Sequence, residues 1–350
     1  MLPLRSYFRR LVENHERGFV TVLLAPFLEL ASLLYGCAVR TVRGFYEKRI
    51  LPRKKFAFPV VSVGNLTWGG TGKTPLVEYL THKLSDRHRR VLILSRGYGS
   101  DEVEQFRRHL PKAVIGVGKD RAKVAAEISA KEKIDLAVLD DGFQHWAIER
   151  DLEVVTLNAL NPFGSKKLIP RGILREPITA LKRAAVIVIT HTNLVARDTL
   201  DSLKGTLRAA SPASLIVEAF LEPLFFYRAQ KRVRVPLSRL AGQRVTTFSA
   251  IANPRSFQLL LGRLEIKPLR NFEFTDHHPF SRQELEEIKA VSLSASCSEV
   301  ITTEKDFCRT PAMITETLNP LVLATRLRIA SGEGQLLERI FRLVEGRQRS

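Results

Sequence analysis

Short apolar runs alternate with amphipathic stretches over most of the chain. The helical spacing of apolar residues is clearest at 73–84 and 121–131. The runs rich in β-branched residues, each short enough for a strand buried on both faces, lie at 60–63, 91–95, 113–117, 136–139, 154–157 and 185–189. This alternation predicts an α/β domain built on a mainly parallel sheet with helices on both faces.

A second, smaller α/β domain is predicted toward the end of the chain. The stretch 215–235 reads as extended structure, with a basic turn between two apolar runs, and predicts a two-stranded link. Beyond it, strands are expected at 245–249, 300–303 and 321–325, and helices at 282–292 and 333–344. The predicted division is an N-terminal segment 1–55, a first domain 56–213, a link 214–240 and a second domain 241–350.

The N-terminal segment differs from the rest of the chain. Residues 18–39 are almost continuously apolar and are interrupted by Pro26 and Glu29. The first 60 residues carry 11 Lys and Arg against 4 Asp and Glu, and cationic flanks favour anionic lipid headgroups. We expect a permanent membrane-associated helix, which either spans the bilayer or lies in its interface. The alternative is a buried helix of a soluble domain.

Composition narrows the classes of protein. The 350 residues are 45% hydrophobic, which excludes intrinsic disorder, and the formal net charge is +19. So large a positive charge indicates acidic partners: nucleic acid, an anionic membrane surface or phosphorylated substrates. The three cysteines lie far apart without a CxxC spacing, which favours neither a disulfide framework nor a zinc cluster.

The most specific local feature is a glycine-rich turn between a predicted strand and a predicted helix, in FPVVSVGNLTWGGTGKTPLVEYL. In a P-loop, backbone N–H groups surround phosphate oxygens, here with Lys73 expected at the β- and γ-phosphates and Thr74 on Mg²⁺. The usual first glycine of the motif is replaced by Thr67. The expected nucleotide-binding residues are Thr67, Trp68, Gly69, Gly70, Thr71, Gly72, Lys73 and Thr74.

Acidic residues follow two of the predicted strands. Asp140 and Asp141 come directly after the run 136–139, at the sheet edge where ligands of open parallel sheets bind. One of them is expected to cap the following turn and the other to serve the metal. Asp101 and Glu102 follow another strand, and Asp276, His277 and His278 form an acid–histidine cluster in the second domain, a pattern that more often marks a turn than a catalytic pair.

Taken together, these motifs resemble the tetraacyldisaccharide 4′-kinases, which phosphorylate a lipid A precursor. The shared segments, in the family's order, are VSVGNLTWGGTGKTP, SRGYGS, DDGFQHWAIERD, LIPRGILREP, FTDHHPF and ITTEKD. The resemblance implies two α/β domains joined by a two-stranded link, with ATP and lipid meeting in the cleft between them. It also implies γ-phosphoryl transfer to the 4′-hydroxyl of a tetraacyldisaccharide 1-phosphate.

The resemblance also implies residue roles. Asp101, paired with His277, would accept the proton of the 4′-hydroxyl, and Lys73 would stabilise the transferred phosphoryl group. Mg²⁺ would be held by Thr74, by Asp140 or Asp141, and by Glu176 of the LIPRGILREP segment. Arg171 and Arg175 would contact phosphates, or else be solvated loop arginines.

The resemblance places the protein at the inner membrane, with the active site on the cytoplasmic face, an anionic membrane surface beside it and a phosphorylated glycolipid as substrate. Two alternatives remain. A membrane-associated P-loop NTPase with a non-lipid role would have the same loop, although the sequence contains no NKxD motif for guanine. A nucleic-acid-binding protein would need one basic stripe with exposed aromatic residues, whereas the charge here is spread along the chain, so no nucleic acid is expected.

Overall fold

The computed structural model describes residues 19–97 and 100–348, and the chain forms two compact units. Within the described residues, the first unit consists of 19–96, 112–220 and 329–348, and the second of residue 97, 100–111 and 221–328. Residues 1–18, with four of the arginines that precede the apolar segment, lie outside the described part.

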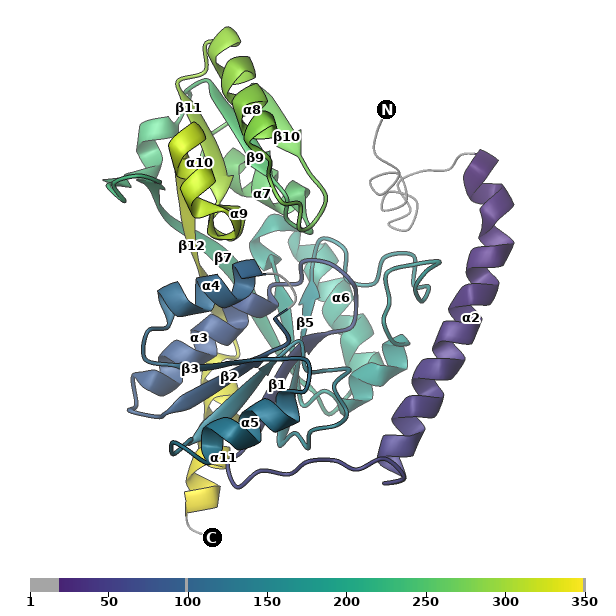
Figure 1. Cartoon of the computed structure of the whole chain (residues 1–350). Coiled ribbons are helices and arrows are strands. Elements are labelled where there is room, and N and C mark those ends of the chain that lie inside the picture. The colour runs from purple at the N-terminus through teal and green to yellow at the C-terminus, as the bar shows by residue number, and fades with distance from the viewer. Residues whose placement is uncertain (1–18, 98–99, 349–350) are drawn as a thin grey trace. The chain divides into compact units, whose positions relative to one another are not determined.

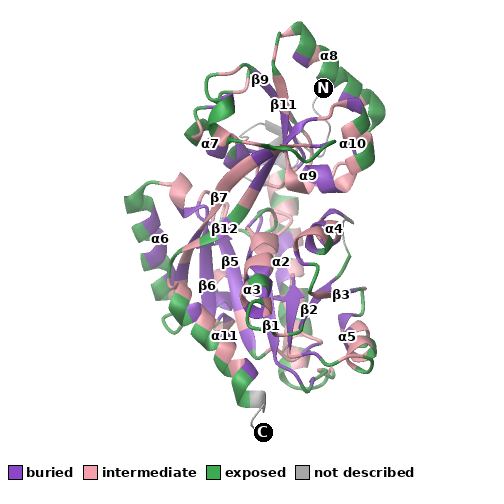
Figure 2. Cartoon of the chain, turned by 90° about the vertical axis from the view of Figure 1, so that its left-hand side faces the viewer, coloured by how far each residue is buried: buried purple, intermediate pink, exposed green. Residues whose placement is uncertain are grey.

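The first unit is built on a parallel sheet (Figure 1). Its strands, in the order β7-β6-β5-β1-β4-β2-β3, pair in parallel throughout. Such a sheet is covered on both faces, which is why β1, β2, β4 and β6 are buried over their whole length (Figure 2). The strands are β1 (Val60–Asn65), β2 (Val91–Ser95), β3 (Val114–Val117), β4 (Leu136–Asp140), β5 (Leu152–Asn158), β6 (Val186–Thr190) and β7 (Leu215–Arg228).

Helices cover this sheet through their apolar sides. α5 (Arg121–Ser129) and α6 (Arg197–Ala210) pack on apolar clusters contributed by the strands, and α3 (Lys73–Ser85) contacts β1, β2 and β4. α11 (Glu333–Gln348) contacts α3, where the Tyr79 hydroxyl donates a hydrogen bond of 2.5 Å to Glu333. The remaining helices of the unit are α2 (Phe19–Glu47) and the short 3₁₀ helices η1 (Ile178–Arg183) and η2 (Thr192–Leu194).

The second unit contains a smaller parallel sheet in the order β10-β9-β11-β12. Two apolar clusters form its core, one around α7 and the other around α8, α9 and α10. β7 continues from the first unit and pairs antiparallel with β8, Phe226 opposite Val235. The elements are α4 (Ser100–His109), β8 (Arg234–Val235), η3 (Leu237–Leu240), β9 (Val245–Ser249), α7 (Pro254–Arg263), β10 (Arg270–Glu273), α8 (Arg282–Ser294), β11 (Glu299–Thr303), α9 (Glu304–Arg309), α10 (Pro311–Thr317) and β12 (Leu321–Ser331).

The predicted fold class, α/β with a mainly parallel sheet and a second smaller α/β unit, is confirmed. The division of the chain is less simple than contiguous segments, however. Residues 97 and 100–111 belong to the second unit, since α4 packs on α9 there. The described residues 329–348 were expected in the second domain and group with the first unit, where Leu336 and Ile340 of α11 are buried. Each of these two segments packs on the unit to which it was not assigned. The sequence shows no linker or change of composition at either boundary.

Candidate active site: a P-loop and an acid–histidine pair

The glycine-rich turn leads from β1 into α3 as a P-loop does. Gly69 and Gly72 have positive φ angles of 112° and 80°, and Gly72 caps the N-terminus of α3. A Cβ on Gly72 would lie 3.0 Å from Thr190, so only glycine fits without displacement. The turn therefore directs its amides and the positive end of α3 to one place, which is an anion-binding arrangement.

Neighbouring strand ends hold the loop from behind. Thr190, at the end of β6, donates to the Thr71 carbonyl at 3.0 Å, and Asn158, at the end of β5, donates to the Gly70 carbonyl at 3.1 Å. The hydroxyls of Thr71 and Thr156 lie 2.7 Å apart in the buried interior. None of the supporting residues Thr156, Asn158 and Thr190 was predicted, although a polar residue at the end of an apolar strand, as at Asn158 and Thr190, is a signal for such a role.

Two positions at the start of the loop have different environments. Thr67 is buried and forms a bridge with Leu174. Trp68 is 63% exposed, and its backbone N–H donates to the Ile173 carbonyl at 2.7 Å. The backbone of both residues is thus held by the segment that precedes Glu176. Their place in nucleotide binding stays a prediction.

Lys73 begins α3 and faces the acid that follows β4. Lys73 Nζ lies 3.5 Å from Asp141 Oδ1, and Arg175 Nη1 donates to both Asp141 oxygens at 2.9 Å. Burial alone would raise the pKa of Asp141, but the charges of Lys73 and Arg175 hold it well below its usual range. Asp141 is therefore a permanent anion that places two cations beside the P-loop.

Asp140 has a different setting. It ends β4 in register with Val63 of β1, its side chain is buried, and Ser95 Oγ lies 3.3 Å from Asp140 Oδ2. Arg121 donates to the Asp140 carbonyl at 2.5 Å. Asp140 thus lies at the carboxyl end of β4, beside the strand β1 that leads into the P-loop.

Glu176 forms an ion pair with an arginine. Its carboxylate is fully buried and accepts hydrogen bonds from Arg183 at 2.7 and 2.9 Å and from Gln144 at 3.1 Å. Within residues 19–97 and 100–348, no three His, Cys, Asp or Glu side chains form a group able to hold a metal ion. The assignment of Thr74, Asp140, Asp141 and Glu176 to Mg²⁺ stays a prediction, and in this structure Asp141 and Glu176 pair with arginine side chains.

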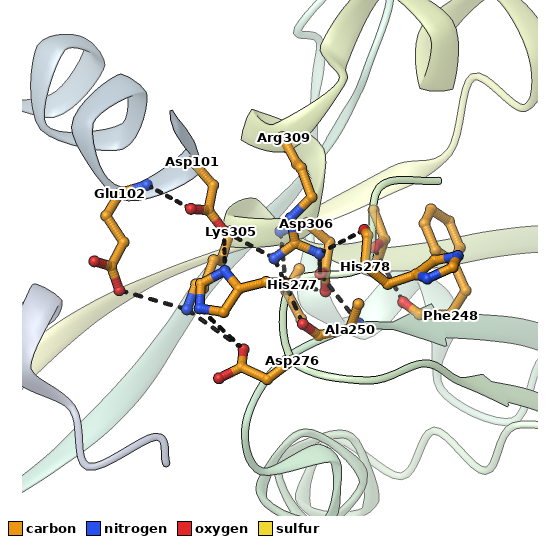
Figure 3. Close-up of polar contacts among 12 residues, drawn as sticks. Asp101, Glu102, Phe248, Ala250, Asp276, His277, His278, Lys305, Asp306 and Arg309 are labelled. Carbon is orange, nitrogen blue, oxygen red and sulfur yellow. Dashed lines mark hydrogen bonds and ion pairs between the residues drawn. The ribbon is translucent and has the colours of Figure 1, made fainter. Parts of the chain in front are cut away.

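In the second unit, Asp101 and His277 do come together (Figure 3). His277 Nδ1 lies 3.2 Å from Asp101 Oδ2, the distance of an ion pair, and Arg309 Nη2 donates to the same oxygen at 2.8 Å. The Asp101 side chain is 1% exposed and that of His277 is 33% exposed. Burial alone would raise the pKa of Asp101, but His277, Lys305 and Arg309 hold it well below its usual range. The pair thus has a buried anion and an accessible imidazole.

Further charges surround the pair. Lys305 Nζ lies 3.5 Å from Glu102 and 3.7 Å from Asp276, and His277 Nε2 lies 3.6 Å from Asp276. His277 also has a positive φ of 136°, a backbone conformation that costs free energy and is found mainly where surrounding contacts enforce it at functional sites. The neighbouring His278 differs in role, since its Nε2 lies 2.8 Å from Glu284 at the N-terminus of α8.

Comparison with known proteins shows the family of this chain. A family model described as tetraacyldisaccharide-1-P 4′-kinase matches residues 24–345. The chain belongs to this family. A probable mitochondrial tetraacyldisaccharide 4′-kinase of Arabidopsis thaliana is 36% identical over 342 residues, 87% of each chain, and the tetraacyldisaccharide 4′-kinase of Anaeromyxobacter sp. (strain K) is 36% identical over 335 residues, 89% of this chain and 87% of the other.

A solved structure of the same family has a similar fold. LpxK from Aquifex aeolicus, crystallised in complex with ATP, superposes with a TM-score of 0.68 at 27% identity, covering 92% of this chain and 99% of that one. The chain is therefore a tetraacyldisaccharide 4′-kinase by family, as the motifs indicated, and the alternative of an NTPase with a non-lipid role is not favoured.

In this kinase, polar residues of α2 contact the segment that leads to Glu176. Ser32 donates to the Leu168 carbonyl at 2.9 Å and Tyr35 to the Arg175 carbonyl at 3.0 Å, while Glu29 pairs with Lys167 at 2.6 Å. The apolar residues Leu24, Phe27, Leu30, Leu33 and Leu34 are exposed. No helix in the described part of the chain is both long and apolar enough to cross a membrane.

Proposed function

We propose that this family member transfers the γ-phosphoryl group of ATP directly to the 4′-hydroxyl of a tetraacyldisaccharide 1-phosphate, with the donor bound by the P-loop and the acceptor activated by Asp101 and His277. The observation that carries this proposal is the P-loop of 67–74, with its two positive-φ glycines and Lys73 at the start of α3. Membership of the family indicates the reaction, and the geometry of the loop is suited to binding the phosphates of the donor.

On the donor side, the loop amides and Lys73 contact the β- and γ-phosphates and stabilise charge that develops on the transferred group. Arg175 adds a second cation, held in place by Asp141. Thr74 and Asp140 are the residues suited to hold Mg²⁺, which would neutralise phosphate charge and orient the γ-phosphate. Asp141 and Glu176 are left to position arginines.

On the acceptor side, the attacking oxygen must lose its proton as the new O–P bond forms and the bond to the leaving ADP oxygen breaks. His277 is the member of the pair that a sugar hydroxyl can reach, because Asp101 is almost completely buried. We infer that the proton passes to the Asp101–His277 pair through the imidazole, and that the Asp101 carboxylate balances the charge this creates. Asp101 itself, first expected to be the acceptor, is the buried half of the pair.

The surface of α2 supports a location at the membrane. Its exposed apolar residues, Arg40 within it and Lys48 and Arg49 after it match a helix lying in the interface of an anionic bilayer. We propose that the protein associates in this way with the leaflet that contains its glycolipid substrate, the cytoplasmic face of the inner membrane.

The proposal is tested by comparing two variants in a label-transfer assay. Lys73→Met should abolish transfer from γ-labelled ATP to the lipid, and His277→Ala should lower kcat at least 100-fold while ATP affinity changes little, since general base catalysis contributes roughly 10² to 10⁴ in rate. Arg282→Met, which breaks an exposed ion pair with Glu316, is the control. Wild-type rates in the Lys73 or the His277 variant would refute the corresponding half of the proposal.

A further inference from the structure

Arg309 occupies a central position beside the acid–histidine pair. Its guanidinium donates to Asp101 Oδ2 at 2.8 Å, to Asp306 Oδ1 at 3.3 Å and to the carbonyl oxygens of His278 at 3.2 Å and Ala250 at 3.5 Å. Its side chain is 7% exposed. One buried side chain thus joins α4, α9, the loop that carries His277 and the end of β9 (Figure 3).

We propose that Arg309 is a positioning residue for catalysis, which fixes the Asp101 carboxylate against His277 and balances its negative charge. The inference rests on the proposed role of that pair and adds a residue to it. Arg309 itself touches neither the nucleotide nor the acceptor in this account.

The balance of charge around Asp101 supports this role. The other cation of the cluster, Lys305, lies between two further carboxylates, at 3.5 and 3.7 Å. Arg309, in contrast, donates directly to Asp101 at 2.8 Å and contacts Asp306 as well. The charged and titratable groups that surround Asp101 are Glu102 on its own helix, Asp276 and His277 in the loop, and Lys305, Asp306 and Arg309 on α9.

The shape of the guanidinium matters as much as its charge. A planar fork reaches Asp101 with one nitrogen and Asp306 with the other, and each nitrogen also meets a backbone carbonyl. A lysine would retain the charge without this fixed geometry. Loss of the charge would raise the proton affinity of the pair, whichever member holds the proton, because Asp101 would be left beside other acids.

α4 does not depend on Arg309 alone for its place in the unit. His109 Nε2 lies 3.4 Å from Glu304, and the Arg108 guanidinium lies 5.5 Å from the centre of the Phe307 ring. Variants at position 309 are therefore expected to keep α4 in place and to remain folded.

The test separates charge from geometry with two variants of the full-length enzyme. Arg309→Gln keeps hydrogen-bond donors and removes the charge, so the acid limb of the kcat/KM profile should move to higher pH by about one unit. Arg309→Lys keeps the charge, so its acid limb should stay near that of the wild type while kcat falls about ten-fold through lost geometry. Arg282→Met serves as the matched arginine control from the same unit.

The opposite results are equally clear. An unchanged acid limb in Arg309→Gln, or full kcat in Arg309→Lys, would overturn the role of Arg309, and the lysine variant decides alone if the glutamine variant does not fold. Asp101→Asn and His277→Ala are measured in parallel. If both retain wild-type turnover, the proposed function of the pair has failed; if both are impaired and the Arg309 variants are normal, only this inference has failed.

Discussion

Lys73 Nζ lies 3.5 Å from Asp141 Oδ1, and this pairing separates the roles of two adjacent acids. Asp141 shares its charge between Lys73 and Arg175, whereas the neighbouring Asp140 meets the Ser95 hydroxyl and has its backbone carbonyl held by Arg121. A one-residue step along the chain thus changes the neighbours of the carboxylate, and we propose that Asp140 rather than Asp141 serves the divalent metal. The sequence alone did not distinguish the two, because both follow the same strand.

The first prediction concerns these two acids. Asp141→Asn should raise KM for ATP several-fold, because Lys73 and Arg175 lose the anion that holds them, while the Mg²⁺ concentration needed for half-maximal rate stays the same. Asp140→Asn should instead raise that Mg²⁺ requirement by about ten-fold or more, as loss of a carboxylate ligand would. Titrating ATP and Mg²⁺ separately in both variants measures the difference. If Asp141→Asn raised the Mg²⁺ requirement and Asp140→Asn raised only KM for ATP, the roles of the two acids would be the reverse of those proposed.

A second prediction concerns Gly72. Gly72→Ala places a methyl group 3.0 Å from Thr190 at a φ of 80°, which should distort the loop and cost about 1–2 kcal/mol of stability together with most of the ATP affinity. Gly205→Ala is the matched control, since it lies within α6 with no atom near its new Cβ and should stabilise by about 0.5–1 kcal/mol. Unfolding midpoints and ATP titrations of both variants are the measurements, and normal ATP binding by Gly72→Ala would contradict the loop geometry.

The membrane role of α2 gives a third prediction. Replacing Phe27 and Leu34, which are 71% and 63% exposed, by serine should weaken binding to vesicles of anionic lipid by roughly ten-fold or more, because each loses about 1 kcal/mol or more of apolar transfer. Leu293→Ser removes an equally exposed leucine from α8 and should leave vesicle binding unchanged. Co-sedimentation of each variant with vesicles across a lipid titration measures this difference in binding. Equal binding by all variants would mean that α2 does not carry the protein to the membrane.

The depressed pKa of Asp101 predicts how stability depends on pH. The carboxyl of an unfolded chain titrates near pH 3.9, and that of folded Asp101 titrates lower, so its contribution is complete above about pH 5 and declines as the pH falls through 4 toward the folded value. The difference in unfolding midpoint between wild type and Asp101→Asn should therefore shrink on acidification between pH 5 and pH 3. A difference that grows over this range would show that the sign of the shift is wrong.

Local patterns in the sequence predicted the elements that line the nucleotide side. The predicted strands 60–63 and 136–139 lie within β1 and β4, and 185–189 overlaps β6. The glycine pattern located the turn between β1 and α3. These signals are local, because strand burial and positive φ depend on residues a few positions apart. The Asp101–His277 contact joins residues far apart in the chain and was available only through resemblance to a family.

Other features had no local signal. Arg309 lies on a helix of six residues, and nothing in its neighbours shows that its guanidinium reaches α4. Glu176 was expected at the metal through the resemblance to the family, and its pairing with Arg183, seven residues later, depends on how η1 folds back. In both cases the charge pairing depends on the folded backbone and not on the pattern of neighbouring residues.

Analysis of the lipid product tests the central claim most directly. Purified protein, ATP labelled in its γ-phosphate, Mg²⁺ and a detergent-dispersed tetraacyldisaccharide 1-phosphate are incubated, and the position of the new phosphate is determined by mass spectrometry and ³¹P NMR. The account predicts one labelled phosphate at the 4′ position with the 1-phosphate retained, and no label with Lys73→Met. Release of labelled inorganic phosphate without labelled lipid, or label at another hydroxyl, would contradict it.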